Sequence, residues 1–283
     1  MKNVKNIITL ALLGAFVLGL SGWAAVKPPD ALSVSERRPL AQRPEMTAAG
    51  VLSGRFMSDY ESYAVDQFPL REQFRTLKAL TSLYGYGQKD NNGVYLVGGY
   101  AAKLDYPLKE ASLTHAAERF RYLYETLMAG TDTHVYFSVI PDKNHFLAEA
   151  NGYPAYDEQA LAEKLAGELE FADYIDLFGS LTLDNYYRTD SHWRQETLLP
   201  AAHTLAEAMG AVLPEDDYRP QTLERPYYGV YYGYAALPME PDQITYLPSD
   251  TLEACSVYNY ESDKNGSVYD LEKGVGKDPY ELF

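Results

Sequence analysis

Cysteine is almost missing from this chain of 283 residues, in which Cys255 is the single example. One thiol cannot form an intrachain disulfide, and it cannot build a metal cluster from thiolates. We interpret Cys255 as a small apolar residue rather than a reactive one. Stability must therefore come from packing, and a chain of this length can bury a full core.

Basic residues are also scarce outside the N-terminus. Three of the 24 lysines and arginines lie in the first 27 positions, so the remainder carries 21 basic and 40 acidic residues, a formal charge of −19. Such a surface repels phosphate backbones and anionic headgroups, and we therefore expect no nucleic acid partner. The sequence has no repeat of fixed period and no low-complexity tract, and its composition is that of a globular protein.

The long apolar run of the chain lies near its start, over residues 7–26. Two lysines precede the run, and Gly22-Trp23-Ala24 offers a cleavage sequence, so residues 1–26 are either a signal peptide or a membrane anchor. The lysines keep the N-terminus in the cytoplasm in both cases. We therefore expect an extracytoplasmic protein, membrane-anchored or secreted, in which the proline-rich residues 27–54 form a linker.

Helical and strand patterns alternate over residues 55–283, the expected domain. Apolar residues recur at helical spacing in segments 55–84, 113–128, 158–171 and 197–209, and Pro69 divides the first of these into two helices. Short apolar runs predict strands at residues 94–97, 134–140 and 174–178. This alternation predicts an α/β fold with a mainly parallel sheet covered by helices. Beyond Gly210, segments 227–234, 256–260 and 267–271 predict a small antiparallel β insertion.

Two clusters in these segments admit a binding role beside a structural one. Gly98-Gly99 follows a predicted strand and could cradle a phosphate, but the spacing of a nucleotide-binding motif is missing, which favours a plain turn. The five tyrosines of residues 227–234 could stack on sugar rings. Because tyrosine also has a high β propensity, we favour strands there.

The most distinctive stretch is Asp190-Ser191-His192-Trp193, just before the helix at 197–209. An aspartate two residues from a histidine can fix one imidazole nitrogen and leave the other as a base, which is half of a Ser-His-Asp arrangement. Ser191 is a poor nucleophile for this pair, because adjacent side chains point apart. His145 follows the predicted strand at 134–140 and is a second candidate acid or base, since ligands collect at that end of open α/β sheets.

A metal site is a further interpretation of the aspartate and histidine, because both residue types bind zinc. It requires a third ligand, and the remaining histidines show no metalloenzyme spacing. We therefore predict that the protein has no metal site and requires no cofactor.

The motif Tyr-Tyr-Arg-Thr-Asp-Ser-His-Trp-Arg-Gln-Glu at 186–196 resembles the signature of the DHHW protein family, which is similar to the SGNH-hydrolase-like acetyltransferases that modify alginate. The resemblance covers residues 35–283 and extends to four further motifs, at 66–71, 140–144, 228–233 and 278–280. Ser191 stands where the family name has histidine. The resemblance implies an SGNH-hydrolase-like three-layer sandwich in which Asp190 orients His192 and His192 activates a serine.

In those relatives the serine follows the Asp-x-His motif, in a segment like Asp-Ser-Phe. The serines after His192 are Ser249, Ser256, Ser262 and Ser267, and none has that context. We therefore expect a copy truncated at its C-terminus that lacks the nucleophile and the closing strands. Such a chain alone should be inactive, because losing one member of a triad costs several powers of ten in rate. Its unpaired strands should also make it fold poorly.

The predicted function is transfer or removal of acyl groups, such as acetyl, on cell-surface polysaccharide, with an acyl donor as a possible partner. Arg188 and Trp193 are candidates to shape the substrate pocket, although a surface salt bridge would equally explain Arg188 and core packing would explain Trp193. The alternative from another class is a non-catalytic surface protein that binds a glycan or a partner protein through its tyrosines.

Overall fold

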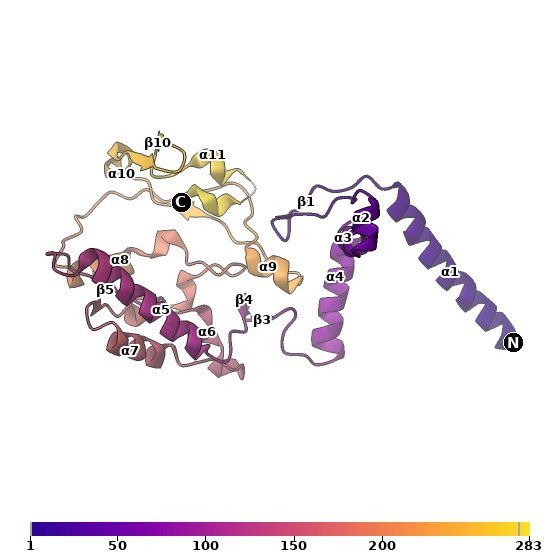
Figure 1. The fold of residues 1–283 in the computed structure, drawn as a ribbon, viewed down its shortest axis with the longest axis horizontal. Helices are drawn as coiled ribbons and strands as arrows, with labels where there is room; N and C mark the ends of the chain where they lie inside the picture. The colour runs from indigo at the N-terminus through magenta and orange to yellow at the C-terminus, as the bar shows by residue number, and fades with distance from the viewer. Residues whose placement is uncertain (1, 277) are drawn as a thin grey trace. The chain divides into compact units, whose positions relative to one another are not determined.

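The computed structural model describes residues 2–276 and 278–283 (Figure 1). The chain separates into two compact units, Met1–Thr81 and Ser82–Phe283. The first unit contains α1 (Lys2–Val26), β1 (Leu32–Ser33), β2 (Arg38–Pro39), α2 (Ala48–Leu52), α3 (Arg55–Asp66) and α4 (Arg71–Leu80), and a π-helical turn, η1 (Thr81–Gly85), follows α4. The two helices predicted on either side of Pro69 are confirmed as α3 and α4.

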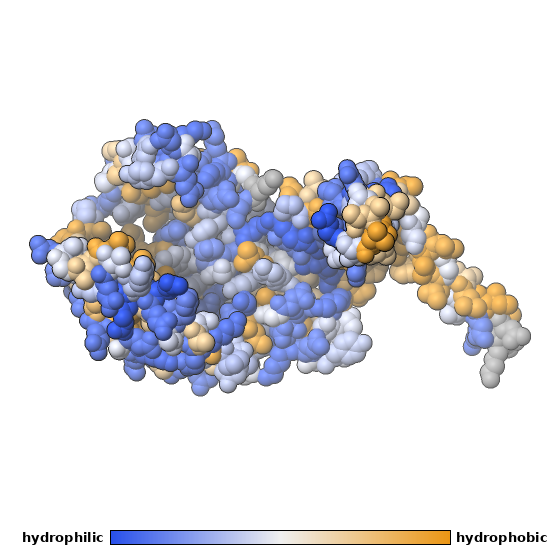
Figure 2. Space-filling view, in the orientation of Figure 1, coloured by the Kyte–Doolittle hydropathy of each residue, from blue (hydrophilic) through white to orange (hydrophobic). Residues whose placement is uncertain are grey.

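Helix α1 is the candidate membrane segment. Val4–Val26 is long and apolar enough to cross a bilayer by length and composition, a property that signal sequences share. Its large apolar side chains are exposed, and Figure 2 shows the helix as a mainly orange rod. An apolar helix of this length near the N-terminus fits a signal sequence or a membrane anchor.

An ion network holds the first unit together after α1. Asp66 at the end of α3 accepts two hydrogen bonds from the Arg38 guanidinium, at 2.9 and 2.7 Å, and one from the Ala41 N–H at 2.9 Å. Arg71 of α4 lies 3.5 Å from the same carboxylate. The amide of Gln67 bonds to both backbone groups of Asp30. These contacts attach residues 30–41, part of the segment predicted as a linker, to α3 and α4.

Replacing Asp66 with asparagine should destabilise this unit locally by about 1–3 kcal/mol, because the guanidinium of Arg38 loses the nearer of two charged partners and keeps only Glu36, at 3.2 Å. The hydrogen bond from Arg38 lowers the pKa of Asp66 to about 2. Its stabilising contribution is therefore complete above the ordinary pKa of 3.8 and is lost as the pH falls through 2. Hydrogen exchange of peptides from residues 30–41, in the full chain in detergent, measures the loss.

The matched control is Asp59→Asn, which removes an exposed carboxylate 3.9 Å from Arg55 in the same unit. Exposed pairs contribute little, so exchange in residues 30–41 should not change. Equal exchange in the Asp66 variant and the wild type would contradict a structural role for the network.

The second unit, Ser82–Phe283, mixes helices with short strands. Its strands are β3 (Val94–Val97), β4 (Tyr100–Lys103), β5 (Tyr136–Phe137), β6 (Asp173–Tyr174), β7 (Gln221–Thr222), β8 (Thr245–Tyr246), β9 (Val257–Asn259) and β10 (Lys264–Gly266). Its α-helices are α5 (Glu110–Leu123), α6 (Lys143–Leu147), α7 (Glu158–Glu168), α8 (Leu199–Ala208), α9 (Val230–Ala235), α10 (Asp250–Ala254) and α11 (Leu271–Gly274). A π-helical turn, η2 (Tyr124–Met128), extends α5, and short 3-10 turns are η3 (Glu149–Asn151), η4 (Phe178–Ser180), η5 (Leu183–Asn185), η6 (Gln195–Thr197) and η7 (Pro279–Leu282).

The mixed helix and strand character predicted from the sequence is confirmed, but its strands pair only two by two. Among the described residues, β5 and β6 form the parallel pair, and the other pairs are antiparallel. The strand predicted at 134–140 is reduced to two residues, and its side chains are only partly buried. Gly98 and Gly99 form the plain turn of the β3–β4 hairpin, both with positive φ.

The tyrosine-rich segment 227–234 corrects a strand prediction. Residues 230–235 form helix α9, and Tyr227 makes only an isolated bridge to Asp242. High β propensity was outweighed here by burial, because Tyr227 and Tyr231 turn inward. The segment 267–271 is also no strand, since α11 begins at Leu271, and the partner of β9 is β10.

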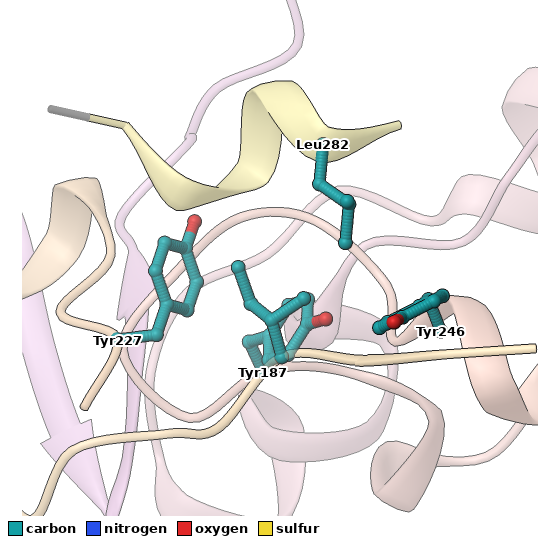
Figure 3. Packing of buried hydrophobic residues seen from close by; sticks show 5 residues of the cluster. Tyr187, Tyr227, Tyr246 and Leu282 are labelled. Carbon is teal, nitrogen blue, oxygen red and sulfur yellow. The ribbon is translucent and has the colours of Figure 1, made fainter. Parts of the chain in front are cut away.

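Two buried clusters lie beside the Asp190–His192 loop. The first joins Tyr187, Tyr227, Ile244, Tyr246 and Leu282. Figure 3 shows Leu282 extending from the C-terminal helical turn toward the rings of Tyr187 and Tyr246. The second cluster contains Ile175, Leu177, Leu181 and Ala201. The loop between these clusters is thus fixed by packing on segments that are distant in sequence.

Candidate active site

Asp190 and His192 form a hydrogen-bonded pair. The Oδ1 atom of Asp190 lies 2.5 Å from Nδ1 of His192, and it also accepts the backbone N–H of His192 at 3.0 Å. Asp190 is completely buried, whereas half of the His192 side chain is exposed. A charged carboxylate can only accept, so Nδ1 carries the hydrogen and Nε2 is left as the basic nitrogen.

The carboxylate is kept charged although it is buried. Burial alone would raise the pKa of Asp190, but hydrogen bonds from His192 and from the Val230 N–H outweigh it and lower that pKa well below the ordinary value. The Val230 bond, 2.8 Å long, comes from the first turn of α9. Asp190 is therefore an anion at every pH at which His192 could act as a base.

Gly229 allows this close approach of α9. A Cβ atom at position 229 would lie 2.3 Å from Cβ of Asp190 and 2.5 Å from its Oδ2, which no side chain tolerates. The backbone at Gly229 has φ −74°, so close packing and not backbone conformation requires glycine. The glycine of the motif at 228–233 thus leaves the space that the Asp190 carboxylate occupies.

Further contacts fix the backbone that leads into Asp190. The Thr189 hydroxyl accepts the Gly229 N–H at 2.9 Å and donates to Asp242 at 2.6 Å. The Thr189 carbonyl accepts the N–H groups of Tyr231 and Tyr232. The loop and the start of α9 therefore form one hydrogen-bonded unit.

The imidazole of His192 packs on an aromatic ring. Tyr280, from the C-terminal turn η7, stacks on it with the ring centroids 4.2 Å apart and an interplanar angle of 24°. Tyr280 in turn meets Tyr187 edge to face at 6.1 Å. This stacking restricts rotation of the imidazole and so keeps its Nδ1 oriented toward Asp190.

The other predicted residues lie in different surroundings. The guanidinium of Arg188 lies over the Tyr100 ring, 5.7 Å from its centre, and lines a cleft of about 510 Å³ with Tyr186 and Asp242. Trp193 packs against the Ile175–Ala201 cluster. A pocket role for either residue stays a prediction.

His145 is not part of the pair. It is exposed on α6, where its ring meets Phe146 and Phe178 edge to face. The residue of this segment that reaches the loop is its neighbour Lys143, whose Nζ donates to the Tyr187 carbonyl at 2.9 Å. The sequence analysis missed Lys143, because lysine is seldom buried.

The serines that follow His192 have structural surroundings. Ser249 is buried, caps α10 through the Leu252 N–H and donates to Asp216. Ser256, Ser262 and Ser267 are exposed around the β9–β10 hairpin. We assign none of these four as a nucleophile. Over the described residues, no group of three or more His, Cys, Asp or Glu side chains is placed to hold a metal ion.

Comparison with known proteins gives similarities in structure. Neither a protein-family model nor a curated protein matches the chain. Similar solved structures include a DHHW family protein from Eubacterium siraeum, with 22% identity, a TM-score of 0.47 and coverage of 56% of this chain and 55% of the other.

The O-acetyltransferase domain of Pseudomonas putida AlgJ shares 19% identity with a TM-score of 0.45, over 57% of this chain and 67% of that domain. Bacillus cereus PatB1 with a sulfonyl adduct shares 12% identity with a TM-score of 0.49, over 67% of this chain and 70% of PatB1. The chain thus spans little more than half the length of the DHHW family protein. These structural neighbours include both groups of proteins that the sequence resembles.

Replacing Gly229 with alanine should destabilise the second unit by about 1–3 kcal/mol, because the new methyl group overlaps the Asp190 side chain. Gly179→Ala is the matched control, since a Cβ there meets nothing within 4 Å. Chemical denaturation measures both variants. Equal unfolding free energies would show that α9 is not packed on Asp190 as described.

Proposed function

We propose that the protein is an extracytoplasmic, SGNH-like acyltransferase or esterase that acts on cell-surface polysaccharide, with His192 as the general base and Asp190 as its orienter. The observation that carries the proposal is the 2.5 Å contact between a buried, charged carboxylate and a half-exposed imidazole. Asp190 holds the Nδ1 proton, and Nε2 of His192 takes a proton from an attacking hydroxyl and returns it to the leaving group.

Substrate is proposed to bind in the cleft lined by Tyr186, Arg188 and Asp242. Arg188 and Asp242 belong both to the cleft and to the contacts around the loop. Tyr100 offers an aromatic face with a polar tip, which suits a sugar ring, and Arg188 lies over the same ring. The apolar helix α1 supports export, either as a signal peptide or as an anchor. The fold is proposed to be of the SGNH-hydrolase-like three-layer type with a mainly parallel sheet.

None of Ser249, Ser256, Ser262 and Ser267 is proposed as the nucleophile, and this chain alone is proposed to have little activity. Such a site requires a hydroxyl within hydrogen-bond reach of Nε2. An acyl donor would bring the acetyl group in a transferase, whereas water would accept it in an esterase.

His192→Ala should abolish the slow release of acetate from an acetylated polysaccharide, because the base that activates water is lost, and should leave binding of the polysaccharide unchanged. Release by the wild-type chain should be slow, and the variant should fall to the buffer rate. His203→Ala, an exposed histidine on α8, is the matched control and should keep the wild-type rate. Equal rates in wild type and His192→Ala would favour a non-catalytic binding protein.

Phenylmethylsulfonyl fluoride tests the proposal that the nucleophile is absent. The reagent sulfonylates serines that a neighbouring base activates, and none of Ser249, Ser256, Ser262 and Ser267 is assigned such a base. We therefore expect the mass of the intact chain to be unchanged after treatment. A single adduct that is lost in His192→Ala would identify a nucleophile and contradict the proposal.

A further inference from the structure

Lys143 is a completely buried lysine beside the Asp190–His192 loop. Its Nζ donates to the Tyr187 carbonyl at 2.9 Å, lies 3.4 Å from the Arg188 carbonyl, and sits 4.9 Å from the centre of the Tyr231 ring. Burying an ammonium group is unfavourable, and an apolar side chain of the same shape would fill the space without this penalty. The positive charge itself therefore requires an explanation.

An aspartate holds the other side of the same backbone. Asp242 accepts the N–H of Arg188 at 2.9 Å, the N–H of Thr189 at 2.8 Å and the Thr189 hydroxyl at 2.6 Å. Within residues 187–189, the carbonyl groups of Tyr187 and Arg188 thus face a cation, and the N–H groups of Arg188 and Thr189 are bound by an anion. We call this arrangement the Lys143–Asp242 clamp. It fixes the three residues that immediately precede Asp190.

The ammonium group of Lys143 is attracted to the carboxylates around it. Burial lowers the pKa of Lys143 to about 8, and attraction to Asp142, Asp190 and Asp242 opposes this effect. Most Lys143 side chains are therefore charged at pH 7. The same attraction means that Lys143 offsets part of the negative potential that Asp190 produces at its neighbours.

We propose that Lys143 is a positioning residue of the dyad, whose ammonium fixes the backbone that presents Asp190 and whose charge weakens the hold of that carboxylate on a protonated His192. This inference rests on the proposed function of His192 as a base. A base that holds its proton too strongly does not return it to the leaving group. Lys143 therefore acts through Asp190 and does not touch the reacting atoms.

Lys143→Met tests the inference, since methionine keeps an unbranched apolar stem and removes the charge. NMR of the full chain in detergent, labelled with ¹³C at histidine Cε1, follows the titration of His192, and His192→Gln identifies its signal. We expect the pKa of His192 to rise by about one unit, because the Asp190 charge is no longer offset. An unchanged titration would overturn the inference.

Lys89→Met is the matched control. Lys89 also donates to a backbone carbonyl, that of Gly152, and lies 5.7 Å from the centre of the Tyr153 ring, but it contacts a different loop. Its loss should leave the His192 titration unchanged. An equal shift in this variant would show a general charge effect and overturn the role of Lys143.

A second variant serves if Lys143→Met does not fold. Asp242→Asn removes the anion of the clamp, and the pKa of His192 should then fall, because less negative charge stabilises the imidazolium. An unchanged pKa in this variant would also overturn the inference. These titrations do not require catalytic turnover, so they test the clamp independently of the proposed function. The proposed function is tested by the acetate-release assay on His192→Ala.

Discussion

The site depends on one hydrogen bond, between the buried carboxylate of Asp190 and Nδ1 of the half-exposed His192. Burying a charged carboxylate costs free energy unless its oxygens accept hydrogen bonds. The structure supplies those donors from the His192 backbone and from the start of α9. It also brings α9 close enough by placing Gly229 against Asp190. The chemistry proposed for His192 follows from this arrangement, because the aspartate selects which imidazole nitrogen is basic.

The surroundings of the pair explain why it stays ordered on a loop. Tyrosine rings form much of the packing. Tyr187 and Tyr227 are buried (Figure 3), and Tyr280 stacks on the imidazole. Charged groups hold the backbone on both sides, with Lys143 on the carbonyl groups and Asp242 on the N–H groups. These contacts come from segments forty or more positions away in sequence, including the motifs at 140–144 and 228–233. The loop is therefore held in its conformation mainly by tertiary contacts.

Features that depend on local contacts could be predicted from the sequence, whereas features that depend on tertiary contacts could not. The Asp190 to His192 contact was predictable, since two residues on one short loop can meet without the rest of the fold. Helices α3, α4, α5, α7 and α8 were predictable from apolar spacing. Lys143 was not, because its burial depends on carbonyl groups distant in the chain, and His145 beside it has the more familiar chemistry. Strands over 227–234 were predicted from tyrosine content, whereas Thr189 and Asp190 bind the N–H groups that start a helix there. The parallel sheet was predicted to be larger than the β5–β6 pair, because propensity does not specify pairing partners.

The central claim is that Asp190 keeps the proton of neutral His192 on Nδ1. Nitrogen-15 NMR of the imidazole measures this directly, since a protonated and an unprotonated ring nitrogen differ widely in chemical shift. At a pH above the His192 titration, the account predicts that Nδ1 has the shift of a protonated nitrogen and Nε2 that of a free base, and that this preference is lost in Asp190→Ala. A proton found on Nε2, or a tautomer ratio that Asp190→Ala leaves unchanged, would contradict it.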